Sequence, residues 1–337
     1  MPFAPTLAAL VIAAVSPTGP NRQPQLAVSK DVVALVFGSG DAIWFTSSAD
    51  AGRSFTAPVK IGELPRLLLG RHRGPRVAIA GGAILVTAIS GDLYAWRSTD
   101  GGRTWPPPAV IDDRALAAEE GLDALAADDE GHVAVAWLDD RTKKGKRLYG
   151  AFSSDAGATW SKNTLLYESP SGTICECCHP SLASLGRGEF AVMWRNAVAG
   201  ARDMYVMRVR DGRPVSEPVK AGEGTWKLDA CPMDGGGLAV AQGKILTAFR
   251  RERTVYRAEP GAPEIRIAEG QDPSLAAGAK GSAVVWSSGP AVWAQAGQGT
   301  KPLTLSPAGA FPVVVALPDG SFLAAWEENA AIDTRRF

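Results

Sequence analysis

The sequence predicts an all-β protein built from repeated units of similar size. Three turns of the form S-x-D-x-G-x-[ST]-[FW] begin at Ser48, Ser98 and Ser153. They lie roughly 50 residues apart, and a fixed period of this size indicates an array of supersecondary units. No stretch shows the periodicity of a useful amphipathic helix, whereas short runs of alternating apolar residues, such as 92–96, recur along the chain.

The shared residues of this turn have a structural explanation. An aspartate in a tight turn accepts hydrogen bonds from nearby backbone N–H groups, and a glycine two residues later tolerates a positive φ. The closing Phe or Trp is a large apolar plug that fixes the turn to a core. We therefore expect structural roles for Asp50, Gly52, Asp100, Gly102, Asp155 and Gly157.

The turn resembles the Asp box, or bacterial neuraminidase repeat, of sialidases and sialidase-like proteins. In that family it joins the third and fourth strands of a propeller blade, on the face opposite the active site. The resemblance therefore implies a β-propeller of four-stranded blades, in which the three turns mark the face without the site.

Seven units can be traced, each beginning with a turn residue and two apolar strands. The last unit has only three strands, and in propellers a strand from the other end of the chain commonly closes the ring. We favour seven blades over six, in one domain spanning 17–337. The units begin near Pro24, Pro75, Leu122, Pro180, Gly235, Pro273 and Pro312, and their second strands end near Phe37, Ile89, Trp137, Trp194, Phe249, Trp286 and Trp326.

The apolar run at 7–15 gives the segment 1–16 two interpretations. It is either the core of a signal peptide or the strand that closes the ring. The run is too short to span a bilayer, and no Lys or Arg precedes it, so the usual basic region of a signal peptide is missing. The family resemblance favours a periplasmic or secreted protein.

Charge balance argues against nucleic acid as a partner. Lys and Arg number 35, as do Asp and Glu, so the chain has no excess charge to attract a polyanion. We expect a small-molecule, glycan or metal ligand, or a protein partner, and no membrane span.

Blade topology predicts where a site would form. Because consecutive strands run antiparallel, the connections into each first strand share the face opposite the Asp boxes, around the mouth of a central channel. His72 and His132 have no evident partners in the sequence, and we expect them at the surface. Residues expected around the mouth include Arg22, Arg73, Glu120, His179, Cys231 and Asp272.

The cysteines give the sharpest local signal on this face. Three precede one first strand and the fourth precedes the next, so the repeat brings both segments together. They either form disulfides that tie adjacent blades or bind a soft metal: copper(I), or zinc(II) without the methionine. The candidate metal ligands are Cys175, Cys177, Cys178, His179, Cys231 and Met233.

The same region carries a second resemblance. A C-x-C-C segment, an Arg-Asp pair and a W-x(4)-C-P segment are similar to a group of exported bacterial proteins labelled sialidase-like. We expect ligand-binding residues beside the cysteines: Arg202, Asp203, Trp226 and Asp229, with Arg195 next to them.

Sialidase activity requires more than the fold. The family holds the substrate carboxylate with three arginines, for which Arg22, Arg195 and Arg250 are the candidates here. None of the five tyrosines stands in a context like that of the family's nucleophile, so the catalytic residues stay unassigned. We hypothesise an exported propeller that binds a ligand or soft metal, the alternatives being a sialidase-type glycoside hydrolase and a protein-interaction propeller with structural disulfides.

Overall fold

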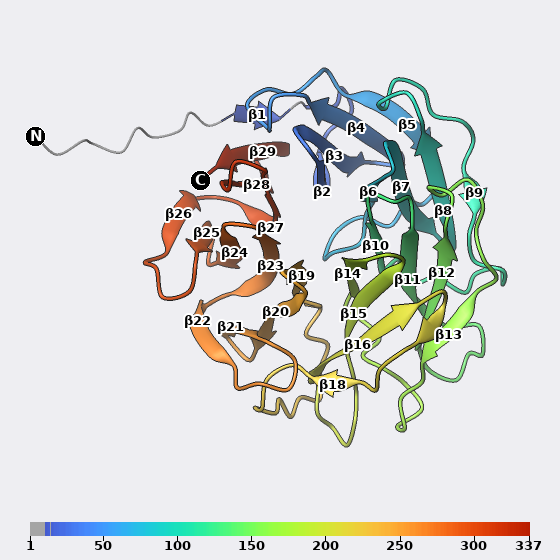
Figure 1. The fold of residues 1–337 in the computed structure, drawn as a ribbon, viewed down its shortest axis with the longest axis vertical. Helices are drawn as coiled ribbons and strands as arrows, with labels where there is room; N and C mark the ends of the chain where they lie inside the picture. Colours follow the sequence, from blue (N-terminus) through green and yellow to red (C-terminus); the bar gives the residue numbers. More distant parts are fainter. Residues whose placement is uncertain (1–10, 14) are drawn as a thin grey trace, which may run out of the picture.

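The protein is a ring of seven antiparallel sheets around a central axis, each a blade of four strands except that the outer edge of one blade is split between two short strands (Figure 1). This computed structural model describes residues 11–13 and 15–337. No helix occurs among these residues, and none of them forms a helix long and apolar enough to cross a membrane. The predicted all-β propeller with seven blades is therefore confirmed.

The first three blades follow one another along the chain, and each contains one Asp box. In every blade the first strand is innermost. Their strands are β2 (Arg22–Ser29), β3 (Val32–Ser39), β4 (Ala42–Ser48) and β5 (Val59–Glu63); β6 (Arg76–Ala80), β7 (Ala83–Ser90), β8 (Asp92–Ser98) and β9 (Ala109–Val110); and β10 (Asp123–Ala127), β11 (Val133–Asp139), β12 (Arg147–Ser153) and β13 (Thr164–Tyr167).

Blades four to six repeat this order without an Asp box. Blade four has a split outer edge, where both β17 and β18 pair with β16. The strands are β14 (Ser181–Gly186), β15 (Glu189–Arg195), β16 (Met204–Arg210), β17 (Arg213–Pro214) and β18 (Val219–Lys220); β19 (Gly237–Ala241), β20 (Lys244–Arg251), β21 (Thr254–Ala258) and β22 (Ile265–Glu269); and β23 (Gln271–Gly278), β24 (Gly281–Ser288), β25 (Ala291–Ala296) and β26 (Leu303–Ser306).

The seventh blade joins the two ends of the chain. It contains β27 (Ala310–Ala316), β28 (Phe322–Glu328) and β29 (Ala331–Arg336), and its outer strand is β1 (Val11–Ala13) (Figure 1). β1 runs antiparallel to β29, with Val11 opposite Thr334. The N-terminal segment thus supplies the closing strand, while most of the segment considered as a signal peptide, residues 1–10 and 14, lies outside the described residues.

The second strand of each blade forms the core, because it is covered by neighbouring blades on both faces. A strand buried on both faces needs a nearly continuous apolar sequence, as in VAVAWLD of β11. Four of these strands carry fully buried indoles near their ends: Trp137, Trp194, Trp286 and Trp326. The predicted aromatic ends of these second strands are confirmed.

The Asp boxes form compact turns between third and fourth strands. In the second box, Asp100 Oδ1 accepts hydrogen bonds from the N–H groups of Arg103 (2.9 Å) and Thr104 (3.0 Å), and Ser98 Oγ accepts one from the Gly102 N–H (3.0 Å). Equivalent bonds recur around Asp50 and Asp155. Hydrogen bonds from Ser and Thr side chains in these turns hold the pKa of all three carboxyls well below their usual value.

The glycine of each box seals a seam between blades. A Cβ on Gly102 would lie 2.1 Å from Phe45 in the preceding blade. The corresponding atoms on Gly52 and Gly157 would lie 2.6 Å from Leu323 and 2.0 Å from Leu85. All three glycines have positive φ, so each is required by both the turn and the packing.

The opposite face is built from irregular loops. We call it the mouth face, and the face with the Asp boxes the box face. Three first strands begin at a β-bulge whose residue before proline is left-handed, namely Gln23 (φ 56°), Asp272 (φ 53°) and Phe311 (φ 51°). Left-handed non-glycine residues cost free energy, so each of these three bulges is kept only because the surrounding structure holds it in place.

Candidate functional site

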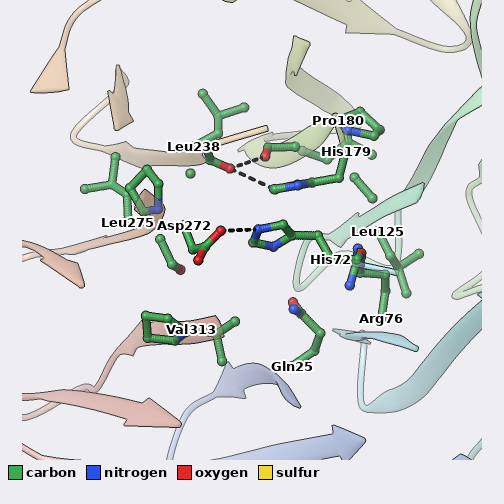
Figure 2. A pocket seen from close by; sticks show the side chains of 18 residues that line it. Gln25, His72, Arg76, Leu125, His179, Pro180, Leu238, Asp272, Leu275 and Val313 are labelled. Atoms are coloured by element: carbon green, nitrogen blue, oxygen red, sulfur yellow. Dashed lines mark hydrogen bonds and ion pairs between the residues drawn. The ribbon is translucent and has the colours of Figure 1, made fainter. Parts of the chain in front are cut away.

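A cavity of about 150 Å³ lies in the channel, ringed by the beginnings of the first strands (Figure 2). All seven blades contribute to its wall, so it is a product of ring closure and not of a single loop. We call it the channel cavity. Its lining includes Gln25, His72, Arg76, Ala124, His179, Gly236, Asp272 and Val313.

His72 and Asp272 face each other across the channel cavity. His72 Nε2 lies 2.9 Å from Asp272 Oδ1, and both side chains are largely buried (Figure 2). The His72 ring packs 4.4 Å from that of His179 and edge-on to Phe311. With Nε2–H donating to the carboxylate, Nδ1 is left as the basic nitrogen, which is the arrangement of an oriented general base.

The expectation of a surface position for His72 is therefore wrong. The loop between β5 and β6 turns inward through left-handed residues at Arg71 and His72 and carries the imidazole into the channel. His132 lies elsewhere, in the turn between β10 and β11 on the box face, where its Nδ1 is 2.9 Å from Asp128.

His179 lines the channel cavity, and one of its buried ring nitrogens has no partner in the described structure. Its Nε2–H donates to the carbonyl of Gly236 (3.1 Å), whereas its buried Nδ1 has no partner among the described residues. Burial, with the charges of His72 and Arg76, lowers the pKa of His179 well below its usual value, so the ring is neutral and Nδ1 is an acceptor. The segment around Gly235 passes so close to His179 that a Cβ on Gly235 would lie 1.9 Å from the His179 carbonyl oxygen.

Arg76 supplies a complementary donor. Its Nε–H donates to the carbonyl of Asp123 (2.9 Å) and its Nη2 to that of His72, but the buried Nη1 finds no partner in the described part of the chain. Thr87 holds the Asp123 carboxylate through a 2.6 Å hydrogen bond. Burial raises the pKa of Asp123, and the charge of Arg76 opposes that rise. Neither Arg76 nor Asp123 was among the residues predicted for the site. The signal in the sequence was an arginine that begins a first strand directly after Gly-Pro.

The second feature of the mouth face is a group of three buried thiols, which we call the sulfur group: Cys175, Cys177 and Cys178. Their Sγ atoms lie within 4.8 Å of one another. Cys175 Sγ is 3.8 Å from Cys177 Sγ and 3.5 Å from Cys178 Sγ. The loop is fixed to β15, because the Cys175 N–H donates to the Arg195 carbonyl at 3.0 Å.

The sulfur group favours one thiolate. Burial disfavours an ionised Cys178, but interactions with Cys175 and Cys177 and the charge of Arg195 outweigh it and lower the pKa of Cys178 well below its usual value. Hydrogen bonds with Cys175 and Cys178, together with burial, raise the pKa of Cys177. Within the group, the thiolate form is therefore favoured at Cys178 and the thiol form at Cys177.

The two cysteine-bearing loops meet, although Cys231 does not join the sulfur group. The chain turns at Met233, which has φ 56°, so Asp234 makes the contact, and its N–H donates to Cys178 Sγ at 3.4 Å. Cys231 is exposed, and all four cysteines are free thiols, without the disulfides of the alternative interpretation. His179 is directed into the channel cavity instead, whereas Met233 packs against the sulfur group.

The three candidate carboxylate-binding arginines do not form a cradle. Arg195 is 1% exposed and donates to the carbonyls of Asp234 (2.9 Å), Arg202 (2.7 Å) and Arg250 (3.0 Å). Arg250 donates to the Pro232 carbonyl (2.6 Å) and pairs with Asp234. Arg22 is exposed. Arg195 and Arg250 join loops of the protein itself, so the assignment of these two to a substrate carboxylate is corrected, whereas that of Arg22 stays a prediction.

The predicted ligand-binding residues are tightly packed. Asp203 accepts a hydrogen bond from the Trp226 N–H (2.8 Å), and Arg202 lines the same small space. That space measures about 10 Å³, room for about one water molecule. Asp229 is exposed and makes no hydrogen bond or ion pair within the described part of the chain. This region supports the mouth loops and leaves no room for an organic ligand.

Asp234 connects the sulfur group to the channel cavity. Its N–H contacts Cys178, its Oδ1 accepts from the Gly236 N–H (3.3 Å), and its Oδ2 accepts from the Asp272 N–H (2.9 Å). Burial and the nearby Asp272 raise the pKa of Asp234. Asp234 thus contacts the sulfur group through its backbone N–H and the loops of the channel cavity through its carboxylate.

Known proteins share this fold. No family description and no curated sequence matches the chain. The Hadza microbial sialidase Hz136 superposes with a TM-score of 0.51 at 15% identity, over 94% of this chain and 65% of its own length. An α-L-arabinanase from Penicillium chrysogenum complexed with arabinobiose gives a TM-score of 0.60 at 12% identity, over 99% and 98% of the chains. An ulvan lyase bound to a GlcA–Rha3S ligand gives 0.61 at 10%, over 97% and 95%.

These comparisons establish the architecture. The chain spans about two thirds of the sialidase and nearly the whole of the other two proteins. At such low identity the likeness concerns the fold, a propeller shared by sialidases, arabinanases and a polysaccharide lyase.

Proposed function

We propose that the sulfur group binds one soft metal ion, copper(I) or zinc(II). The observation that carries this proposal is the spacing of three buried Sγ atoms. The Sγ of Cys175 lies 3.5 Å from that of Cys178 and 3.8 Å from that of Cys177. A metal about 2.3 Å from each thiolate requires sulfurs about 3.8–4.0 Å apart. The group therefore accommodates a metal after an expansion of a few tenths of an ångström.

The surroundings of the sulfur group support the same proposal. The charge of Arg195 favours a thiolate at Cys178, and the thiolate is the form of cysteine that binds metals. We also propose that the protein is periplasmic or secreted, as the resemblance of its sequence suggests. Free thiols are unusual in such oxidising compartments, and a bound metal would protect them.

Metal stoichiometry tests this function. Reduced protein is exposed to copper(I) or zinc(II) without oxygen, and bound metal is counted after desalting. We expect one ion per chain in the wild type and in Cys231→Ser, which alters the exposed thiol. In Cys178→Ser the affinity should fall at least about tenfold, because a ligand is lost. Absence of metal from the wild type, or equal losses in both variants, would refute the proposal.

A second proposed function concerns the channel cavity, where we infer binding of a hydroxylated ligand such as a sugar unit. Two residues that line this cavity each carry one buried polar atom without a partner in the described structure: a donor, Arg76 Nη1, and an acceptor, His179 Nδ1. A buried polar atom without a partner is costly, and a hydroxyl group satisfies both donors and acceptors. The comparison proteins are carbohydrate-active by their descriptions, which agrees with this choice.

His72 would do the chemistry if the ligand is also a substrate. Asp272 orients the imidazole, and the free Nδ1 would take a proton from a hydroxyl group or water. A sialidase-type reaction is less well supported, because Arg195 and Arg250 are already bonded to the protein and no carboxylate cradle remains.

The histidines themselves allow a test of the channel proposal. The chain has 3 histidines, so their imidazole resonances can be assigned by single substitutions. Adding arabinobiose or sialic acid should shift the signals of His72 and His179 and leave that of His132, on the box face, unchanged. A panel of neutral and acidic saccharides that moves neither channel signal would contradict saccharide binding.

A further inference from the structure

We propose that the ion bound by the sulfur group is copper(I), held in a three-coordinate site by Cys175, Cys177 and Cys178. This inference rests on the proposed metal binding and adds the identity and geometry of the site. It follows from the donor atoms that lie within reach of the sulfur group and from those that do not.

No nitrogen or oxygen ligand completes a tetrahedron. Among the described residues, the three Sγ atoms form a group that no His, Asp or Glu atom joins. His179, next in sequence, is directed away and bonded to the Gly236 carbonyl. Asp234 contacts Cys178 through its N–H. Its two carboxylate oxygens accept hydrogen bonds from the N–H groups of Gly236 and Asp272. Zinc normally takes four ligands, so these donors leave it one short.

The enclosure of the cysteines leaves no room for water as a fourth ligand. Cys175, Cys177 and Cys178 are 1%, 7% and 1% exposed. A zinc ion with three protein ligands keeps an open position for water, which needs both space and hydrogen-bond partners. A buried site of three thiolates instead matches a soft monovalent ion that accepts sulfur ligands alone, which is copper(I).

Met233 closes the site from the mouth face. It packs against the three cysteines, and its Sδ lies 3.0 Å from Arg71 Nη1 of the neighbouring loop. Both residues are left-handed, with φ of 56° and 53°, so two loops bend to form this contact. We assign Met233 the role of an apolar cover that excludes water, since its sulfur accepts from Arg71.

X-ray absorption on the full-length reduced protein tests the geometry. With copper(I) bound, we expect three sulfur neighbours at about 2.3 Å and no nitrogen or oxygen neighbour. Met233→Leu keeps a cover of similar size and should retain three sulfurs. Cys231→Ser is the matched control for a cysteine outside the group and should give the same spectrum as the wild type.

Each other outcome separates this inference from the proposed function. A fourth sulfur that disappears in Met233→Leu, or any nitrogen or oxygen neighbour, would overturn the three-coordinate site while leaving metal binding intact. Tighter binding of zinc(II) than of copper(I) in direct competition would overturn the choice of ion. Failure to bind either ion would refute the proposed function itself.

Discussion

The two faces of the ring are built on opposite principles. On the box face, three nearly identical turns satisfy their own hydrogen bonds, and each glycine packs on the preceding blade. On the mouth face, every loop differs, and buried charged side chains join one blade to the next. Repeated turns therefore stabilise the ring, whereas the loops that depart from the repeat form the candidate site.

Different contacts hold neighbouring blades together at different seams of the ring. The boxes seal the seams before blades one, two and three. Between blades four and five no box is present among the described residues, and Arg195 of blade four instead donates to two carbonyls of the blade-five segment, those of Asp234 and Arg250. The region that carries the sulfur group is therefore held by buried charge in place of a turn motif.

Removing the buried arginine should have the largest effect. In Arg195→Ala, three carbonyl groups lose their donor, and we expect a loss of about 3–5 kcal/mol in the free energy of unfolding. Chemical denaturation measures this loss. The exposed Arg22→Ala is the control, expected to change stability by less than about 0.5 kcal/mol. Equal effects of the two substitutions would show that the mouth face is not held together by Arg195.

Two adjacent glycines test the seam on the box face. Gly101 and Gly102 both have positive φ, but a Cβ on Gly101 meets nothing within 4 Å, whereas one on Gly102 meets Phe45. We expect Gly102→Ala to cost about 2–4 kcal/mol and Gly101→Ala about 1 kcal/mol, since only the first adds a clash to the backbone strain. If both variants unfold at the same denaturant concentration, the glycine does not seal the seam.

The buried carboxyl of Asp112, which lies outside the boxes, should respond to pH in the opposite direction to the box carboxyls. Burial raises the pKa of Asp112 to about 7, and one of its oxygens has no partner in the described structure. Because the folded pKa exceeds the unfolded value, this carboxyl favours folding below about pH 4 and loses that contribution as pH rises through about 7. Asp112→Asn should therefore be more stable than the wild type above neutral pH, but not in acid.

The box carboxylates supply the internal comparison. Thr159 and its neighbours lower the pKa of Asp155 to about 2, so its contribution is present above about pH 4 and is lost only in strong acid. Asp155→Asn should reduce stability at neutral pH. Thermal unfolding of both variants at acid and neutral pH checks the two signs, and the same pH trend in both would contradict the contrast.

The smallest expected effect concerns the fourth cysteine. Cys231 is exposed and outside the sulfur group. Cys231→Ser should leave the unfolding free energy within about 0.5 kcal/mol of the wild type. In the wild type, the Cys231 thiol should react faster with a thiol reagent under native conditions than the three buried thiols. A large loss of stability on this substitution would indicate a bond that ties the two loops together.

Sequence periodicity predicted repeated β units, and the resemblance of the turns to the Asp box predicted that these units form a ring of blades. The recurring strand pairs and the incomplete last unit predicted the second strands and the number of blades, because these features repeat. The clustering of Cys175, Cys177 and Cys178 was predicted because residues so close in sequence need little help from the fold to meet.

The remainder of the site depends on backbone directions that no spacing encodes. The left-handed turn at Met233 replaces Cys231 by Asp234 at the contact, and the inward bend at His72 makes a channel residue from an apparent surface one. Arg195 looked like a substrate ligand because its type suits carboxylates, yet its buried position commits it to backbone carbonyls.

Metal-dependent stabilisation tests the central claim most directly. A ligand that binds the folded chain raises its stability, so one equivalent of copper(I) should raise the Tm of the reduced wild type and of Cys231→Ser alike. The same addition should leave the Tm of Cys178→Ser nearly unchanged. A Tm of the wild type that does not move, or a rise that persists without Cys178, would contradict a metal site at the sulfur group.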